Sequence, residues 1–373
     1  MKKIAALLLC TALAVGALAG CGSSSTTTSE TTTSEAATEA ATEAVVETES
    51  AAAETETAAT ETAGGAAKTG FATINSISKS TSATADAEGL AEVDTLAAAV
   101  LLDADGKIVA CEIDSIQSKA NFSAEGVITS DITAEVQSKN ELGDAYGMKG
   151  SSAIGKEWFE QAEAFAQYVV GKTADEVAGI AINEEGYAGD EDLIASVTVH
   201  IGDFVAVVQK AATNAKELGA SSTDMLGMAA TTSLSGSKDA AADAEGLVQA
   251  YSYYSVVTTN ADGVITSCYS DASQGKVNFD TAGAVTSDLA VAPQTKQELG
   301  DAYGMKAKSA IGKEWYEEAD AFSAYCVGKT LDEVKGIAVD AEGLATDADL
   351  VSSVTVHVTD LINTVAKAVE NAK

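Results

Sequence analysis

Apolar and polar residues follow two different patterns along the chain. Two nearly continuous apolar runs, residues 96–103 and 107–114, flank the turn Ala104-Asp105-Gly106. An Asp-Gly pair between apolar runs is a strong signal for a β-hairpin. A second, shorter hairpin is predicted from residues 120–123 and 126–130.

Helical spacing replaces the strand pattern further along. One apolar stripe consists of Ile154, Trp158, Ala162, Phe165 and Val169, and a later stripe consists of Ile201, Phe204, Val205, Val208 and Ala212. Gly171 lies where the first helix would end. Residues 173–176 (TADE) have the capping-box pattern of another helix start.

The same pattern occurs twice. Residues 69–216 align without a gap to residues 226–373, and the blocks ELGDAYGMK, SAIGKEW and GKT are shared. The repeated unit is far too long for a solenoid repeat. We therefore predict two tandem homologous domains joined by a linker at 217–225. Each has β-hairpins followed by helices, which is an α+β class.

The N-terminal region has a different composition. A Met1-Lys2-Lys3 start and an apolar run to Ala19 indicate a signal peptide over residues 1–20. The run ends in Leu18-Ala19-Gly20-Cys21, which resembles the bacterial lipobox, and this resemblance implies lipidation of Cys21. Residues 21–68 are rich in Ser, Thr, Glu and Ala and lack aromatic residues before the first repeat, so we expect a disordered tether.

These features predict a protein anchored by lipid on the extracytoplasmic face of the cell membrane. The net charge of −34 argues against a nucleic-acid partner, which would require basic patches. The same negative charge would repel anionic lipid headgroups, so membrane association would depend on the lipid at Cys21. Beyond it, Cys111, Cys268 and Cys326 are too few for a disulfide framework. We expect buried thiols, with a Cys268–Cys326 bond as an open alternative.

The chain's two histidines each close a copy of one nonapeptide. The copies are DLIASVTVH at residues 192–200 and DLVSSVTVH at residues 349–357. One interpretation is a short buried strand that leads into the terminal helix. The other is a binding site, because a threonine near a helix start lies beside unpaired N–H groups that suit a phosphate.

This segment resembles the end of the FMN-binding domains of extracytoplasmic bacterial flavoproteins. Their pattern is Asp, two residues, Ser or Thr, Gly, Ala and Thr, and the last threonine carries FMN through a phosphoester bond. Here Ser-Val replaces Gly-Ala in both copies. The DGKI hairpin also resembles that family. The resemblance implies cofactor-binding roles for Asp192, Ser196, Thr198, Asp349, Ser353 and Thr355, with Thr198 and Thr355 as FMN acceptors. His200 and His357 would face the same ligand if they lie in the first turn of the terminal helix, and a half-buried structural role is the alternative.

The resemblance implies an electron carrier loaded by a flavin transferase and supplied by a membrane redox partner. The alternative is a cofactor-free lipoprotein that keeps the fold and binds a ligand or protein through Tyr146, Met148 and Trp158. No catalytic residue stands out. The acidic loops 183–192 and 340–349 do not match calcium-ligand spacing, so no metal site is predicted. We also expect Tyr251, Tyr253 and Tyr254 to mark a contact between the domains.

Overall fold

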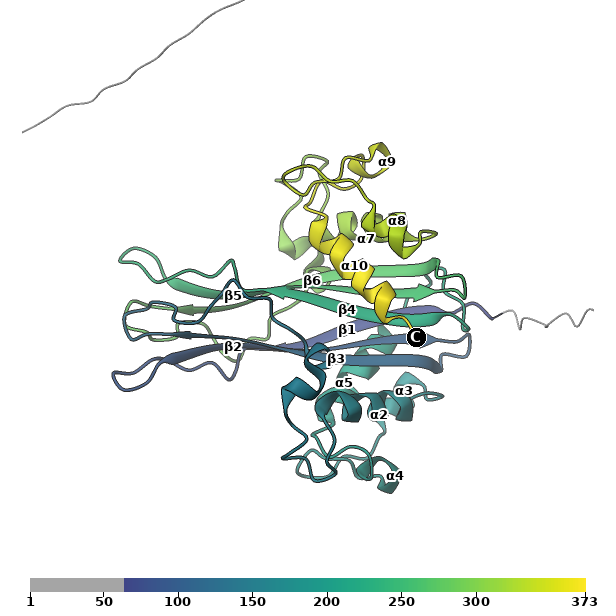
Figure 1. Cartoon of the computed structure of the whole chain (residues 1–373), viewed down its shortest axis with the longest axis horizontal. Coiled ribbons are helices and arrows are strands. Elements are labelled where there is room, and N and C mark those ends of the chain that lie inside the picture. Colours follow the sequence, from purple (N-terminus) through teal and green to yellow (C-terminus); the bar gives the residue numbers. More distant parts are fainter. Residues whose placement is uncertain (1–63) are drawn as a thin grey trace, which may run out of the picture. The chain divides into compact units, whose positions relative to one another are not determined.

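The computed structural model describes residues 64–373, which contain both repeats (Figure 1). The predicted signal peptide, the lipidation site Cys21 and nearly all of the predicted tether lie outside the described residues. Among the helices of residues 64–373, none combines the length and the apolar character needed to cross a membrane.

The two repeats have the same order of elements, and the predicted α+β class is confirmed. The first repeat contains β1 (Lys68–Ser76), β2 (Gly89–Leu102), β3 (Ile108–Phe122), α1 (Lys139–Leu142), the 3₁₀ helix η1 (Gly143–Tyr146), α2 (Trp158–Tyr168), α3 (Ala174–Ala178), α4 (Glu191–Ile194) and α5 (Gly202–Thr213). The second contains β4 (Met225–Ser233), β5 (Gly246–Thr259), β6 (Ile265–Phe279), α6 (Lys296–Leu299), the 3₁₀ helix η2 (Gly300–Tyr303), α7 (Trp315–Cys326), α8 (Leu331–Lys335), α9 (Ala348–Val351) and α10 (Thr359–Asn371).

Each repeat forms one three-stranded antiparallel sheet, in the order β1-β2-β3 or β4-β5-β6. The predicted hairpin is confirmed, and Gly106 takes the positive φ of 77° that its turn requires. The second predicted hairpin forms in minimal length. Residues 120–122 end strand β3, Phe122 pairs with Ile128 through one isolated antiparallel bridge, and the N–H groups of Ser123 and Thr129 donate to the carbonyl oxygens of Val127 and Asn121 at 2.8 and 2.9 Å.

Strand β2 is buried on both faces, which explains its nearly continuous apolar sequence. Ala97, Ala99 and Leu101 belong to a core shared with the other repeat. Ala98, Val100 and Leu102 belong to the core beneath the helices of their own repeat. Because neighbouring strand residues point to opposite faces, an element in the middle of a layered structure needs apolar residues at every position.

The sheets of the two repeats pack face to face, and helices cover the outer face of each sheet (Figure 1). Phe122 and Phe279 stack across this interface, with ring centroids 4.2 Å apart and an angle of 9° between the rings. Each ring also lies over a glycine of its own sheet. A Cβ atom on Gly89 or Gly246 would come within 2.3 Å of the ring of Phe122 or Phe279, respectively.

Reciprocal ion pairs join the repeats. Lys367 of α10 pairs with Glu141 of α1, and Lys210 of α5 pairs with Glu298 of α6. Each lysine Nζ atom also donates to a strand carbonyl oxygen at 2.9 Å, in β4 and β1 respectively. The equivalent residues therefore make equivalent contacts in both directions, so the duplicated chain packs as a pseudo-symmetric pair.

The shared blocks of the duplication have a structural role. The buried Glu157 caps helix α2, and its carboxylate accepts the backbone N–H groups of Met148 and Lys149 at 2.8 and 2.9 Å. The helix therefore begins at Trp158, and Ile154, the first residue of the apolar stripe, lies before it. The predicted capping box at Thr173 is confirmed.

Candidate functional site

The two nonapeptides form a short helix followed by an irregular segment. Helices α4 and α9 end at Ile194 and Val351, and neither copy contributes a residue to a named strand. The interpretation as a buried strand is therefore wrong. The irregular segments after α4 and α9 lead to the terminal helices α5 and α10.

The valines that replace alanine in the flavin-attachment pattern point into the protein core. Val197 and Val354 are each 2% exposed and pack in the cores beneath the helices. The serines that replace glycine, Ser196 and Ser353, donate hydrogen bonds to the carbonyl oxygens of Leu193 and Leu350, both at 3.2 Å. Their extra bulk is therefore accommodated within each helix–loop segment.

Both candidate acceptor threonines bond to a buried side chain of the main helix. Thr198 donates its backbone N–H and its hydroxyl to Oε1 of Gln161, at 2.7 and 3.2 Å. Thr355 makes the same contacts with the carboxylate of Glu318, at 2.6 Å for the N–H. Gln161 and Glu318 occupy equivalent positions in α2 and α7, and each is 0% exposed.

The remaining motif residues are exposed. His200 packs on Tyr187 of the acidic loop, with ring centroids 4.4 Å apart, and His357 lies in the corresponding place beside Gly343. The carboxylates of Asp192 and Asp349 face solvent at the starts of α4 and α9. Of the eight predicted cofactor-binding residues, Thr355 and His357 line the same cavity.

That cavity, which we call the aromatic cavity, has a volume of about 400 Å³ and lies in the second repeat. Its lining residues are Tyr251, Tyr253, Lys296, Tyr303, Met305, Lys308, Ser309, Ala310, Trp315, Thr355, Val356 and His357. Tyr303, Met305 and Trp315 are the equivalents of Tyr146, Met148 and Trp158, which the sequence suggested as pocket residues. In the second repeat, the aromatic cavity therefore contains residues from both regions that the sequence suggested as binding sites: the nonapeptide and the equivalents of Tyr146, Met148 and Trp158.

Lys296 lies among three aromatic rings of this cavity. Its Nζ atom is 4.7 Å from the ring centroids of Tyr251 and Tyr303 and 4.6 Å from that of Trp315. The Nζ atom also donates a hydrogen bond to the Tyr251 hydroxyl. Burial lowers the pKa of Lys296 to about 7, while the faces of the rings stabilise its charged form. Lys296 thus adds a buried amine to an aromatic wall.

Sequence reasoning missed Lys296 and Glu318 and did not distinguish the two faces on which the three tyrosines lie. Tyr254 does contact the other repeat, since its ring lies 5.6 Å from that of Phe71. Tyr251 and Tyr253 point to the opposite face of β5, where they line the aromatic cavity and stack at 4.7 Å. Because successive residues of a strand point to opposite faces of the sheet, the sequence spacing alone separates Tyr254 from Tyr251 and Tyr253.

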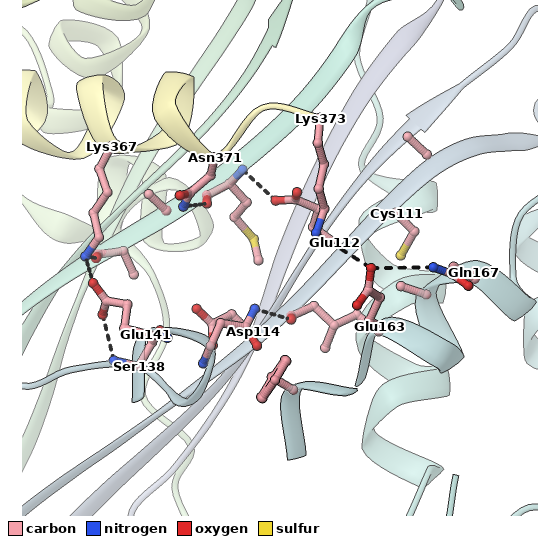
Figure 2. A pocket seen from close by; sticks show the side chains of 18 of the residues that line it. Cys111, Glu112, Asp114, Ser138, Glu141, Glu163, Gln167, Lys367, Asn371 and Lys373 are labelled. Carbon is pink, nitrogen blue, oxygen red and sulfur yellow. Dashed lines mark hydrogen bonds and ion pairs between the residues drawn. The ribbon is translucent and has the colours of Figure 1, made fainter. Parts of the chain in front are cut away.

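A second cavity, which we call the inter-repeat cleft, has a volume of about 570 Å³. Figure 2 shows Lys367 and Lys373 of the second repeat directed toward Glu141 and Glu163 of the first. Glu112 in this cleft accepts the N–H of Met228 at 2.8 Å, and burial raises the pKa of Glu112 to about 7. The cleft contains none of the residues implied by the flavin-attachment pattern.

The three cysteines in the described part of the chain carry free thiols. Cys268 and Cys326 are buried together in the core of the second repeat, as predicted for buried thiols, whereas Cys111 is half-buried and lines the inter-repeat cleft. Within residues 64–373, no group of three or more His, Cys, Asp or Glu side chains is arranged to hold a metal ion.

Comparisons with known proteins add a short match. No family model and no solved structure matches the chain. A segment of 42 residues is 52% identical to chlorophenol reductase of Desulfitobacterium hafniense. The segment covers 11% of this chain and 13% of that protein. The shared segment is thus a small part of both proteins and assigns the chain to no family.

Proposed function

We propose that this protein is an extracytoplasmic flavin-binding lipoprotein that acts as an electron carrier. The observation that carries the proposal is the aromatic cavity of the second repeat. There Thr355, implied by the flavin-attachment pattern, meets Trp315, Tyr303 and Lys296. Pockets that bind cofactors typically combine aromatic walls with a few polar groups that fix orientation.

The lining residues are chemically suited to FMN. Flat aromatic walls can pack on a flat ring system. Lys308 supplies positive charge for a phosphate, Lys296 adds a buried amine, and the Thr355 hydroxyl borders the same cavity. Because Val354 points into the core, the replacement of Gly-Ala does not fill the cavity.

In this proposal Thr355 holds the phosphate end, and the aromatic side chains exclude water from the ring. A bound flavin supplies reversible one- or two-electron transfer. The chain's own contribution is orientation and local charge. The exposed Lys308 favours an anionic ligand, and the Lys296 amine and the tyrosine hydroxyls offer hydrogen bonds at the cavity wall.

The proposal includes the membrane anchor and the partners. Lipidation of Cys21 would hold the protein at the membrane, and the segment after it would act as a tether. A flavin transferase would load the cofactor, and a membrane redox protein would exchange electrons with it. The redox enzyme named in the 42-residue match agrees with such a setting, but the proposal does not depend on it.

The second candidate function is cofactor-free binding of a ligand or protein. The inter-repeat cleft favours it, because this larger cavity lies apart from the attachment pattern. A protein of this type would keep Thr198 and Thr355 as structural residues that bond to helices α2 and α7.

The test uses the full chain, co-expressed with a flavin transferase in a host that supplies FAD. Intact mass spectrometry and in-gel fluorescence after denaturation would measure covalent flavin, and quenching of tryptophan fluorescence by added FMN would measure non-covalent binding. We expect added mass equal to one or two FMN groups. Unmodified mass together with no FMN binding would exclude this function and favour the alternative.

The matched control is Thr359→Ala. Thr359 is an exposed threonine four residues after Thr355, at the start of α10, and it lies outside the attachment pattern. Substituting Thr198 and Thr355 together should abolish the covalent flavin, whereas Thr359→Ala should retain it.

A further inference from the structure

The two candidate acceptor threonines bond to side chains of different chemistry. In the first repeat the partner is Gln161, a neutral amide. Its Oε1 atom accepts both groups of Thr198, and its Nε2 atom donates to Ser152 and to the carbonyl oxygen of Lys156, both at 3.2 Å. Both polar atoms of the Gln161 amide are therefore hydrogen-bonded, and a neutral amide is too weak a base to take a proton from the threonine hydroxyl.

In the second repeat the partner is the carboxylate of Glu318. It accepts the Thr355 hydroxyl at 3.0 and 3.1 Å, the Thr355 and Val356 N–H groups at 2.6 and 3.0 Å, and the Ser309 hydroxyl at 2.8 Å. Among the ion pairs of residues 64–373, none involves Glu318. A buried carboxylate that forms no ion pair and touches a hydroxyl is placed to accept that hydroxyl's proton.

The residues around the two threonines also differ between the repeats. In the second repeat Tyr251 and Lys308 line the aromatic cavity. The aligned residues of the first repeat are Asp94 and Ser151. Asp94 is a carboxylate held in an ion pair with Lys79 at 2.6 Å, where the second repeat has an uncharged phenol.

From these differences we infer that the two repeats are not equivalent: Thr355 is the residue that accepts the flavin, Glu318 is the general base for its attachment, and Thr198 stays unmodified. This inference rests on the proposed function. The carboxylate that would repel a phosphate becomes neutral when it takes the proton, which removes the repulsion as the new bond forms.

The attachment step balances as follows. The Thr355 oxygen forms a bond to the phosphorus of the FMN half of FAD, while its proton passes to Glu318. The bond between that phosphorus and the bridging oxygen of the AMP half breaks, and AMP leaves with the electron pair of this bond. No oxidant or reductant is needed, because the step transfers a phosphoryl-linked group from one oxygen to another.

The test is peptide mapping of the full chain after co-expression with a flavin transferase and FAD. We expect flavin on the peptide that contains Thr355 and none on the peptide that contains Thr198. Glu318→Gln should lower the initial rate of modification by about a hundredfold. Gln is the residue that the first repeat carries at this position, so the variant should fold, and circular dichroism would verify this.

Two further variants keep the inference falsifiable. Glu318→Asp retains a carboxylate and should restore part of the rate, whereas Gln161→Glu places a carboxylate beside Thr198 and should permit modification there. Equal modification of both threonines, or of Thr198 alone, would overturn the inference and leave the proposed function intact. An unchanged rate of modification in folded Glu318→Gln would also overturn the inference. Non-covalent FMN binding without covalent flavin on the wild-type chain would also overturn the inference. The absence of both covalent flavin and FMN binding would instead overturn the proposed function.

Discussion

The hydroxyl of Thr355 donates a hydrogen bond to the buried carboxylate of Glu318, which lies 37 residues earlier on helix α7. The same carboxylate accepts two backbone N–H groups from the irregular segment before α10. It therefore fixes the position of Thr355 relative to the aromatic cavity, whatever ligand that cavity takes.

This relationship predicts how substitutions of Glu318 affect stability. Glu318→Ala leaves the N–H groups of Thr355 and Val356 and the Ser309 hydroxyl without their acceptor. We expect a loss of about 3 kcal/mol in the free energy of unfolding, measured by urea denaturation. Glu318→Gln should cost only about 1 kcal/mol, because an amide oxygen can accept these bonds as Gln161 does. Equal losses for the two variants would contradict this account.

The Phe122–Phe279 stack predicts that the repeats unfold together. Both side chains are 0% exposed, so Phe122→Ala should lower the free energy of unfolding by about 3–5 kcal/mol. A double-mutant cycle with Phe279→Ala should give a coupling energy of about 1 kcal/mol, since the rings touch. The half-buried Phe159 provides a control that should show no coupling to Phe279. Additive losses at Phe122 and Phe279 would exclude the packed interface.

Asp271 predicts a pH dependence. Burial is the main cause that raises the pKa of this fully buried carboxyl to about 7. Between about pH 4 and pH 7 the folded protein then holds a proton that the unfolded chain has lost, so stability falls as pH rises. One such group contributes a slope of about 1.4 kcal/mol per pH unit. Asp271→Asn should flatten the measured slope by this amount.

The control for this measurement is Asp262→Asn, in the exposed turn between β5 and β6. It should leave the slope of unfolding free energy against pH unchanged. The same slope in the protein and in Asp271→Asn would show that Asp271 holds no extra proton in the folded state.

The reciprocal ion pairs predict modest and similar couplings. Lys367 and Glu141 have side chains that are 25% and 26% exposed, so a double-mutant cycle with Lys367→Met and Glu141→Gln should give about 0.5–1 kcal/mol at low salt. The cycle for Lys210 and Glu298 should give a similar value. High salt should reduce both. A coupling at one pair only would contradict the pseudo-symmetric packing of the repeats.

Several features of the fold follow from local sequence patterns. The Asp105-Gly106 turn between apolar runs predicts the β2–β3 hairpin, and the Thr173 capping box predicts α3, because a turn and a helix cap each depend on a few neighbouring residues. Strand β1 was not predicted, and the hairpin predicted at residues 120–130 is reduced to one isolated bridge. Strand β1 and residues 120–122 pair with strand β2, which lies beyond the reach of a local pattern.

The candidate site, too, has features that the sequence reveals and features that only the fold reveals. The repeated threonine and the aligned aromatic residues could be recognised along the chain, since a duplication preserves residue types at a constant spacing. The gathering of Thr355, Trp315, Tyr251 and Lys296 around one cavity could not, because it depends on how helix α7 and the segment before α10 pack on strand β5. The difference between Gln161 and Glu318 is visible in the alignment, but only the folded chain puts each against its threonine. Local periodicity and duplication thus establish the elements, whereas close packing of distant segments decides which side chains meet.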